Sequence, residues 1–179
     1  LSSHKTLELR SKFPDFVYVS IGYHPEQKPM TDKDRIEFEH LIEKELNSIT
    51  AIGEIGLPYY TLEKWSELEK TRHFEDYEWW VRLADKVNLP VAIHAVHTET
   101  DKALKVLANF KNVKAHFHWL KAPLPVFEEV VKRGYFISFT PELCYRERDQ
   151  HLLTLVPITQ LLIETDGPWS YNDQFAGLE

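Results

Sequence analysis

Short apolar runs alternate with longer amphipathic segments along most of the chain. The runs are four to seven residues long and rich in Val, Ile and Phe, which is typical of buried strands. We expect six strands, at residues 16–22, 50–55, 89–93, 113–117, 135–139 and 161–164. Between them, apolar positions recur every three or four residues, which predicts helices. The predicted helices are the residues up to 13, a segment from Thr31 to Leu46, and the stretches 62–87, 103–110, 126–131 and 146–156.

This alternation of strands and helices predicts βαβ units and a parallel sheet. An open doubly wound sheet and a (β/α)₈ barrel both fit six such strands. The open sheet usually binds phosphate through a glycine-rich first loop, and neither G-x-G-x-x-G nor a P-loop occurs here. Polar residues follow many of the strands, which favours the barrel, so we predict an α/β (β/α)₈ TIM-barrel type of fold with six of its eight strands in this sequence.

Length and composition indicate one domain over residues 1–179, and 43% hydrophobic content is ample for a core. The single cysteine, Cys144, excludes an internal disulfide and fits a reducing compartment. No apolar run is long enough to span a membrane and no secretory signal opens the chain, so we predict a cytoplasmic protein without a membrane partner. The net charge of −7 does not favour nonspecific nucleic-acid binding, although it leaves a metal-assisted nuclease open.

Four side chains suited to metal binding follow four different strands. Glu54 lies inside the glycine-flanked run TAIGEIG, and His94, His116 and Asp166 end other apolar runs. The carboxyl ends of parallel strands meet at one edge of a sheet, so these residues should converge. Two carboxylates and two imidazoles suit zinc, manganese or iron. Taken singly, Glu54 could be an ion-paired structural carboxylate, each histidine a hydrogen-bonded core residue, and Asp166 a cap.

Three further histidines lie near the same strand ends. His24 and His97 come just beyond strands and could bind substrate or be solvated loop residues. His118 is two residues from His116, so both point to one side of a strand. It could contact substrate or orient its neighbour.

Six motifs together resemble the TatD family of metal-dependent hydrolases, within the amidohydrolase superfamily of barrels. They are IGYHPE at 21–26, AIGEIGLPYY at 51–60, LPVAIH at 89–94, AHFHW at 115–119, YFIS at 135–138 and LLIETDGPW at 161–169. The resemblance implies that the six strands are the third to eighth of the barrel. It also implies that Glu54 bridges two metals, that His94 and His116 hold one of them, and that Asp166 binds the other or acts as general base.

The same resemblance implies one or two divalent ions per chain (zinc, manganese or magnesium) and phosphodiester hydrolysis, as by a deoxyribonuclease acting on DNA ends. Glu54 and Asp166 would be catalytic, and His24 would line the substrate pocket. From their positions near strand ends we also predict His97 and His118 as substrate contacts. A small amide, ester or lactone is the alternative substrate, and a non-catalytic binding module is the alternative class.

Two departures from the family pattern affect these expectations. The family begins with an H-x-H pair on its first strand, whereas His4 stands alone here, so we expect the first two strands and the terminal helix to lie outside this sequence. Pro58 stands where the family usually has Asp, and His97 where it often has Arg or another polar residue, which leaves the usual phosphate contacts open.

Overall fold

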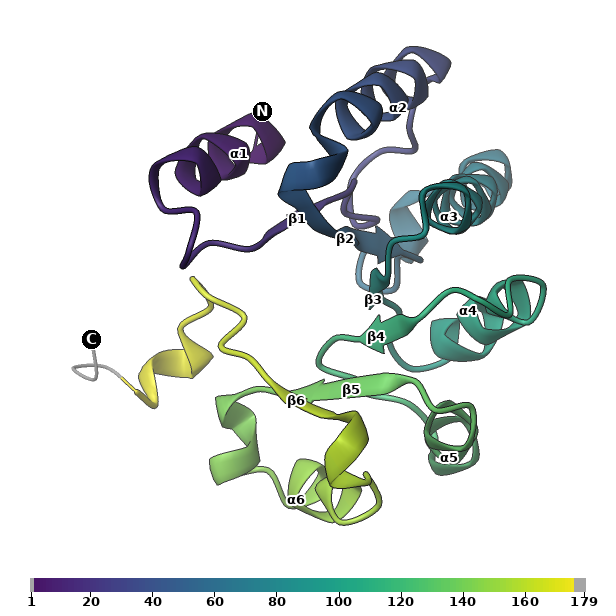
Figure 1. The fold of residues 1–179 in the computed structure, drawn as a ribbon. Coiled ribbons are helices and arrows are strands. Elements are labelled where there is room, and N and C mark those ends of the chain that lie inside the picture. The colour runs from purple at the N-terminus through teal and green to yellow at the C-terminus, as the bar shows by residue number, and fades with distance from the viewer. Residues whose placement is uncertain (1, 176–179) are drawn as a thin grey trace.

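Six parallel strands, each hydrogen-bonded to the next in chain order, form one curved sheet (Figure 1). A computed structural model describes residues 2–175. The strands are β1 (Val19–Ile21), β2 (Ile49–Gly56), β3 (Val91–His94), β4 (Ala115–Phe117), β5 (Phe136–Phe139) and β6 (Leu161–Ile163). Every neighbouring pair is parallel. Such a strand order, with a helix between successive strands, is that of a (β/α)₈ barrel, as the sequence predicted.

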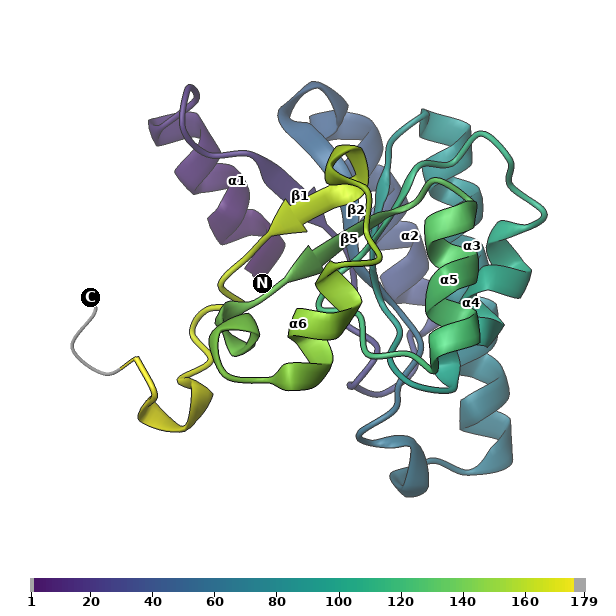
Figure 2. The same cartoon turned by 90° about the horizontal axis from the view of Figure 1, so that it is seen from below.

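Helices cover the outer face of this sheet. They are α1 (Ser2–Lys12), α2 (Asp32–Glu45), α3 (Glu67–Val87), α4 (Glu99–Leu107), α5 (Leu124–Lys132) and α6 (Glu147–Leu153). Figure 2 shows α3, α4 and α5 side by side on one side of the sheet, with the C-terminal segment on the other side beyond β6. Among the described helices, none combines the length and apolar character that crossing a membrane requires.

The core lies between the sheet and these helices. Its largest fully buried side chains include Trp80 and Tyr77 of α3, Phe117 of β4 and Phe127 of α5. The strand isoleucines Ile21, Ile52, Ile55, Ile93 and Ile137 are each 0% exposed. Burial of this kind stabilises the fold by roughly 25 cal/mol per Å² of apolar surface removed from water.

Helix boundaries follow local capping chemistry. Thr31 caps α2 through the predicted box with Asp34. The predicted helix at 62–87 is wrong in its first part: residues Leu62–Lys64 form a separate 3₁₀ turn, and α3 begins after Ser66. Ser66 and Glu69 make a second capping box, at which α3 begins. The predicted first strand is also shorter than expected, because residues 14–16 form a turn.

Candidate metal centre

A cavity of about 440 Å³ opens at the carboxyl ends of the strands. Glu54 comes from β2, His94 ends β3, and His118 follows β4 directly. Asp166 comes shortly after β6. The other lining residues are His24, Tyr60, Val96, Trp119, Lys121, Glu142, Arg146, Trp169 and Asn172. Three of the four residues predicted to converge, Glu54, His94 and Asp166, therefore line one cavity.

Gly56, two residues after Glu54, allows β2 and β3 to approach closely. A Cβ atom on Gly56 would lie 1.9 Å from the carbonyl oxygen of His94, and its φ of +150° disfavours any side chain. The glycine-flanked run of the sequence thus brings the carboxylate of Glu54 and the imidazole of His94 to the same small region.

Glu54 faces two imidazoles. Its Oε1 lies 2.8 Å from His118 Nε2, and its Oε2 lies 3.7 Å from His24 Nε2. Burial raises the pKa of Glu54, but the contact with His118 and the other histidines outweighs it and lowers the pKa to about 2. Glu54 is therefore an anion at neutral pH, available to a cation.

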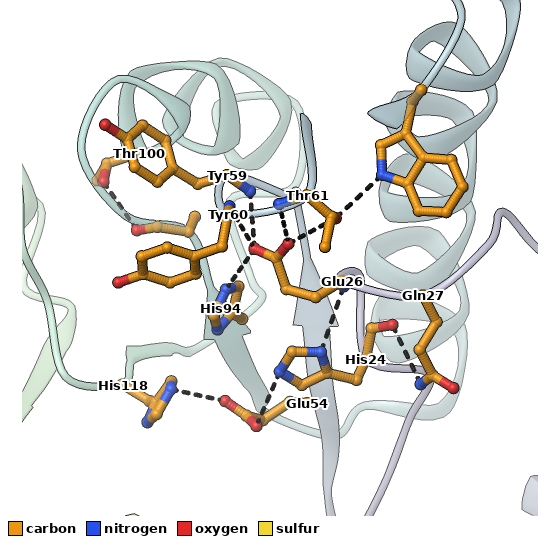
Figure 3. A network of polar contacts seen from close by, with 12 residues as sticks. His24, Glu26, Gln27, Glu54, Tyr59, Tyr60, Thr61, His94, Thr100 and His118 are labelled. Carbon is orange, nitrogen blue, oxygen red and sulfur yellow. Dashed lines mark hydrogen bonds and ion pairs between the residues drawn. The ribbon is translucent and has the colours of Figure 1, made fainter. Parts of the chain in front are cut away.

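His94 is held on its other side by Glu26. The His94 Nε2 atom lies 3.1 Å from Glu26 Oε1, and the ring is buried. Glu26 accepts backbone N–H groups of Tyr59, Tyr60 and Thr61 at 2.8, 3.1 and 2.8 Å, as Figure 3 shows. Hydrogen bonds from His94, from the Thr61 hydroxyl and from the backbone of Tyr59 and Tyr60 oppose the effect of burial and keep the pKa of Glu26 well below its usual range. The loop at 59–61 therefore fixes the carboxylate, and the carboxylate fixes His94.

His118 is fixed in a similar way by Glu164. Its Nδ1 atom lies 2.8 Å from Glu164 Oε2. Glu164 Oε1 accepts the backbone N–H of Trp119 at 2.8 Å and the Ser138 hydroxyl at 2.5 Å. Burial lowers the pKa of His118, but Glu164 and Glu54 outweigh it and raise the pKa to about 10. This histidine is thus locked in place between two carboxylates.

The donor set fits a divalent cation. His24, Glu54 and His94 each offer a ligand atom within 4.8 Å of the others, and so do His118, Glu164 and Asp166. The buried His94 Nδ1 atom has no hydrogen-bond partner. Unsatisfied buried atoms are costly, and carboxylate with imidazole is a ligand set for zinc or manganese. A cation bound here would satisfy this nitrogen.

Two of the predicted site residues lie elsewhere. His116, a predicted ligand, directs Nε2 to the Ser138 hydroxyl at 2.6 Å and does not line the cavity. Burial lowers its pKa to about 4, so it is neutral. The sheet ends β4 at Phe117, so His118 is the histidine that reaches Glu54. His97, a predicted substrate contact, lies against Tyr59 with the rings tilted and 4.5 Å between their centroids, and does not line the cavity either.

Several residues of the site received no role from the sequence. Glu26 lies in the motif IGYHPE and Glu164 in the motif LLIETDGPW. The one sequence signal for their role was that each carboxylate lies two residues from a candidate site residue, His24 or Asp166. Lys121 and Arg146 line the cavity from loops, where no periodic pattern marks them. Lys121 Nζ lies 3.3 Å from the ring centroid of Trp119, so the cavity has a cationic and aromatic wall.

Comparison with known proteins agrees with this fold. The sequence model of the family described as TatD related DNase matches residues 2–179, and the chain belongs to this family. An uncharacterized metal-dependent hydrolase of Haemophilus influenzae is 32% identical over 171 residues, covering 96% of this chain and 68% of that protein. The human deoxyribonuclease TATDN3 is 27% identical, covering 92% of this chain and 62% of that protein. The 3'-5' ssDNA/RNA exonuclease TatD of Erwinia tasmaniensis is 27% identical, covering 94% and 65%.

Solved structures give the same fold. The TatD homolog YJJV of Escherichia coli superposes with a TM-score of 0.75 at 22% identity, covering 91% of this chain and 62% of that one. A TatD family hydrolase of Entamoeba histolytica gives a TM-score of 0.72 at 22% identity, covering 91% and 56%. The chain thus spans roughly 56–68% of the length of these relatives and structures. The family resemblance and the fold class predicted from the sequence are confirmed.

Proposed function

We propose that this chain carries a divalent-metal site that hydrolyses phosphodiester bonds, with Glu54, His94 and His118 as metal ligands. His118 replaces His116 in the ligand set that the sequence suggested, and its Nε2 would give up its proton to Glu54 or to water in order to hold the ion. The observation that carries the proposal is that a carboxylate holds each of the two histidine ligands. Glu26 contacts His94 and Glu164 contacts His118, each through the ring nitrogen that is not offered to the ion. Carboxylates behind metal-binding histidines orient the ring and raise its basicity, which is a recurrent feature of metal sites.

The residues around the cavity have complementary roles in hydrolysis. When bound, a divalent ion lowers the pKa of water from 15.7 towards ~7 and so supplies a nucleophile at neutral pH. Asp166 lines the cavity, and we assign it to accept the proton of the attacking water or to bind a second ion. Lys121 and Arg146 are cations on the same wall, suited to the negative charge of a phosphate group.

The cavity wall also favours a nucleic-acid end over a small amide. Trp169 and Tyr60 are 57% and 58% exposed and line the cavity, so a base can stack on either ring. Lys121 and Arg146 place positive charge in the cavity of a protein whose net charge of −7 otherwise repels a polyanion. The deoxyribonuclease and exonuclease names of two relatives support the same substrate class.

The test is metal content followed by turnover. Metal per chain is measured by mass spectrometry after reconstitution with Mn²⁺ or Zn²⁺, for the wild type and Glu54→Gln. Loaded protein is then assayed on a labelled single-stranded oligonucleotide and, in parallel, on amide, ester and lactone substrates. We expect bound metal and oligonucleotide cleavage in the wild type, with both lost in Glu54→Gln. Cleavage of the small substrates alone would contradict the phosphodiester assignment, and absence of bound metal in the wild type would contradict the metal site.

A further inference from the structure

We infer that Glu26 is a positioning residue that gives His24 and His94 different roles, so that His94 offers a lone pair to a cation while His24 offers a proton. The inference deepens the proposed function and rests on the proposed metal centre. The two rings lie close together, with 4.7 Å between their centroids, and by distance alone either could take the cation. Hydrogen bonding distinguishes them.

The carboxylate of Glu26 determines the tautomer of His94. It receives three backbone N–H groups and the Thr61 hydroxyl, the last at 2.7 Å, so it is an ionised acceptor. An ionised carboxylate cannot donate, so the His94 Nε2 atom at 3.1 Å must carry the proton. The lone pair of a neutral His94 then lies on Nδ1, which is buried and has no hydrogen-bond partner. That atom is the one available to a metal ion.

The backbone of the same residue determines the tautomer of His24. The Glu26 N–H donates to His24 Nδ1 at 3.3 Å, which requires a lone pair there (Figure 3). A neutral His24 therefore carries its proton on Nε2, the atom 3.7 Å from Glu54 Oε2. An N–H group repels a cation and suits an anionic oxygen. His24 is thus a donor toward Glu54 or toward a substrate oxygen.

Local sequence makes this double role available. Pro25 separates the two residues and has no N–H of its own, so the next backbone donor toward His24 is that of Glu26. The side chain of Glu26 then continues to the loop at 59–61, where Trp65 Nε1 donates to Thr61 Oγ1 at 3.0 Å and supports the loop in turn. The three residues His24, Pro25 and Glu26 therefore act as one unit that orients two imidazoles.

The experiment reads the tautomers directly in metal-free protein by long-range ¹H–¹⁵N NMR of the histidine rings. In the wild type we expect the proton on Nε2 in both His24 and His94. In Glu26→Ala, the His94 signals should move to a tautomer mixture with Nδ1–H, whereas His24 should not change because the backbone N–H remains. The Mn²⁺ affinity of Glu26→Ala, measured by calorimetry, should fall ~10–100-fold, as for other residues behind metal ligands.

Thr61→Val is the matched control. It removes one hydrogen bond to Glu26 and loosens the loop, but leaves the carboxylate against His94, so the His94 tautomer should be unchanged. A wild-type His94 with its proton on Nδ1 would overturn the inference without any variant, as would an unaltered His94 in folded Glu26→Ala. The expected tautomers in a wild type that binds no Mn²⁺ would support the role of Glu26 in orienting the rings and overturn the proposed metal function instead.

Discussion

The Nδ1 atom of His118 lies 2.8 Å from Glu164 Oε2, and this contact turns the opposite ring nitrogen toward Glu54. Glu164 is itself held by Ser138 and by the backbone of Trp119. The ring of His118 is thereby fixed by groups from β5 and from the segment after β6, which join distant parts of the chain at one ligand.

The first prediction separates His118 from His116. His118→Gln should lower divalent-cation affinity at least ~100-fold, because it removes the nitrogen next to Glu54. His116→Gln keeps a polar contact with Ser138 available and should change the affinity less than about tenfold. Calorimetry with Mn²⁺ measures both. The assignment of ligands would be reversed if His116→Gln were the more damaging change.

A second prediction concerns the anchor between α2 and α3. The buried carboxylate of Asp76 accepts Arg35 Nε at 3.1 Å and the Met30 N–H at 2.8 Å. Asp76→Asn leaves these donors poorly paired, so the free energy of unfolding should fall by about 3 kcal/mol. Urea denaturation gives the value. Glu78→Gln, which breaks an exposed pair with Arg82, is the control and should cost about 0.5 kcal/mol or less.

The third prediction is a pH dependence at the start of α2. Asp34 accepts the Thr31 N–H at 2.7 Å, and its hydrogen bonds with Thr31 lower its pKa. Because the folded pKa is depressed, the stabilisation is present above ~3.8 and is lost as pH falls through the folded value.

Asp34→Ala should therefore cost about 1 kcal/mol at pH 7, a typical cap contribution, and less in strong acid. Unfolding in urea at several pH values tests it. A cost that stayed constant down to pH ~2, far below the ordinary Asp pKa, would contradict the capping role. Glu37→Ala, at an exposed i,i+4 pair with Lys33, is the control.

A fourth prediction addresses the cationic wall of the cavity. Lys121→Met and Arg146→Met should each raise KM for an oligonucleotide more than they lower kcat, since both side chains lie in the cavity without holding the proposed ligands. Each should also reduce the slope of log KM against log salt by about 0.7, the value for one phosphate contact on a single strand. Lys132→Met, on the exposed end of α5, is the control. An unchanged salt slope in both cavity variants would argue against a phosphate contact.

The order and type of the strands followed from the sequence, because a buried parallel strand is a short apolar run whatever surrounds it. The N-terminal cap of α2 could also be predicted from the sequence, because Thr31 and Asp34 are close enough along the chain to contact each other within one helical turn. The break between the 3₁₀ turn and α3 was signalled by Ser66 and Glu69, but the helical periodicity on both sides obscured it. The spacing of apolar residues thus predicted which helices and strands form better than it predicted the residues at which they begin and end.

The choice between His116 and His118 could not follow from spacing. Residues two apart point to the same side of a strand, so both satisfied the pattern. The strand ends at Phe117, and the turn that follows, with Trp119 at φ +38°, decides which ring reaches Glu54. The role of Glu26 depends on His94, 68 residues away, and only the folded chain brings these two side chains together.

The contact of Lys121 with the ring of Trp119 makes the fluorescence of this tryptophan a measure of substrate binding. A cation 3.3 Å from the ring centroid shifts the energy of the indole excited state, and the backbone N–H of the same tryptophan is held by Glu164. We therefore expect an anion that draws Lys121 away to alter the emission of Trp119. The difference spectrum between the wild type and Trp119→Phe therefore isolates substrate docking from turnover, without a label and before any bond is broken.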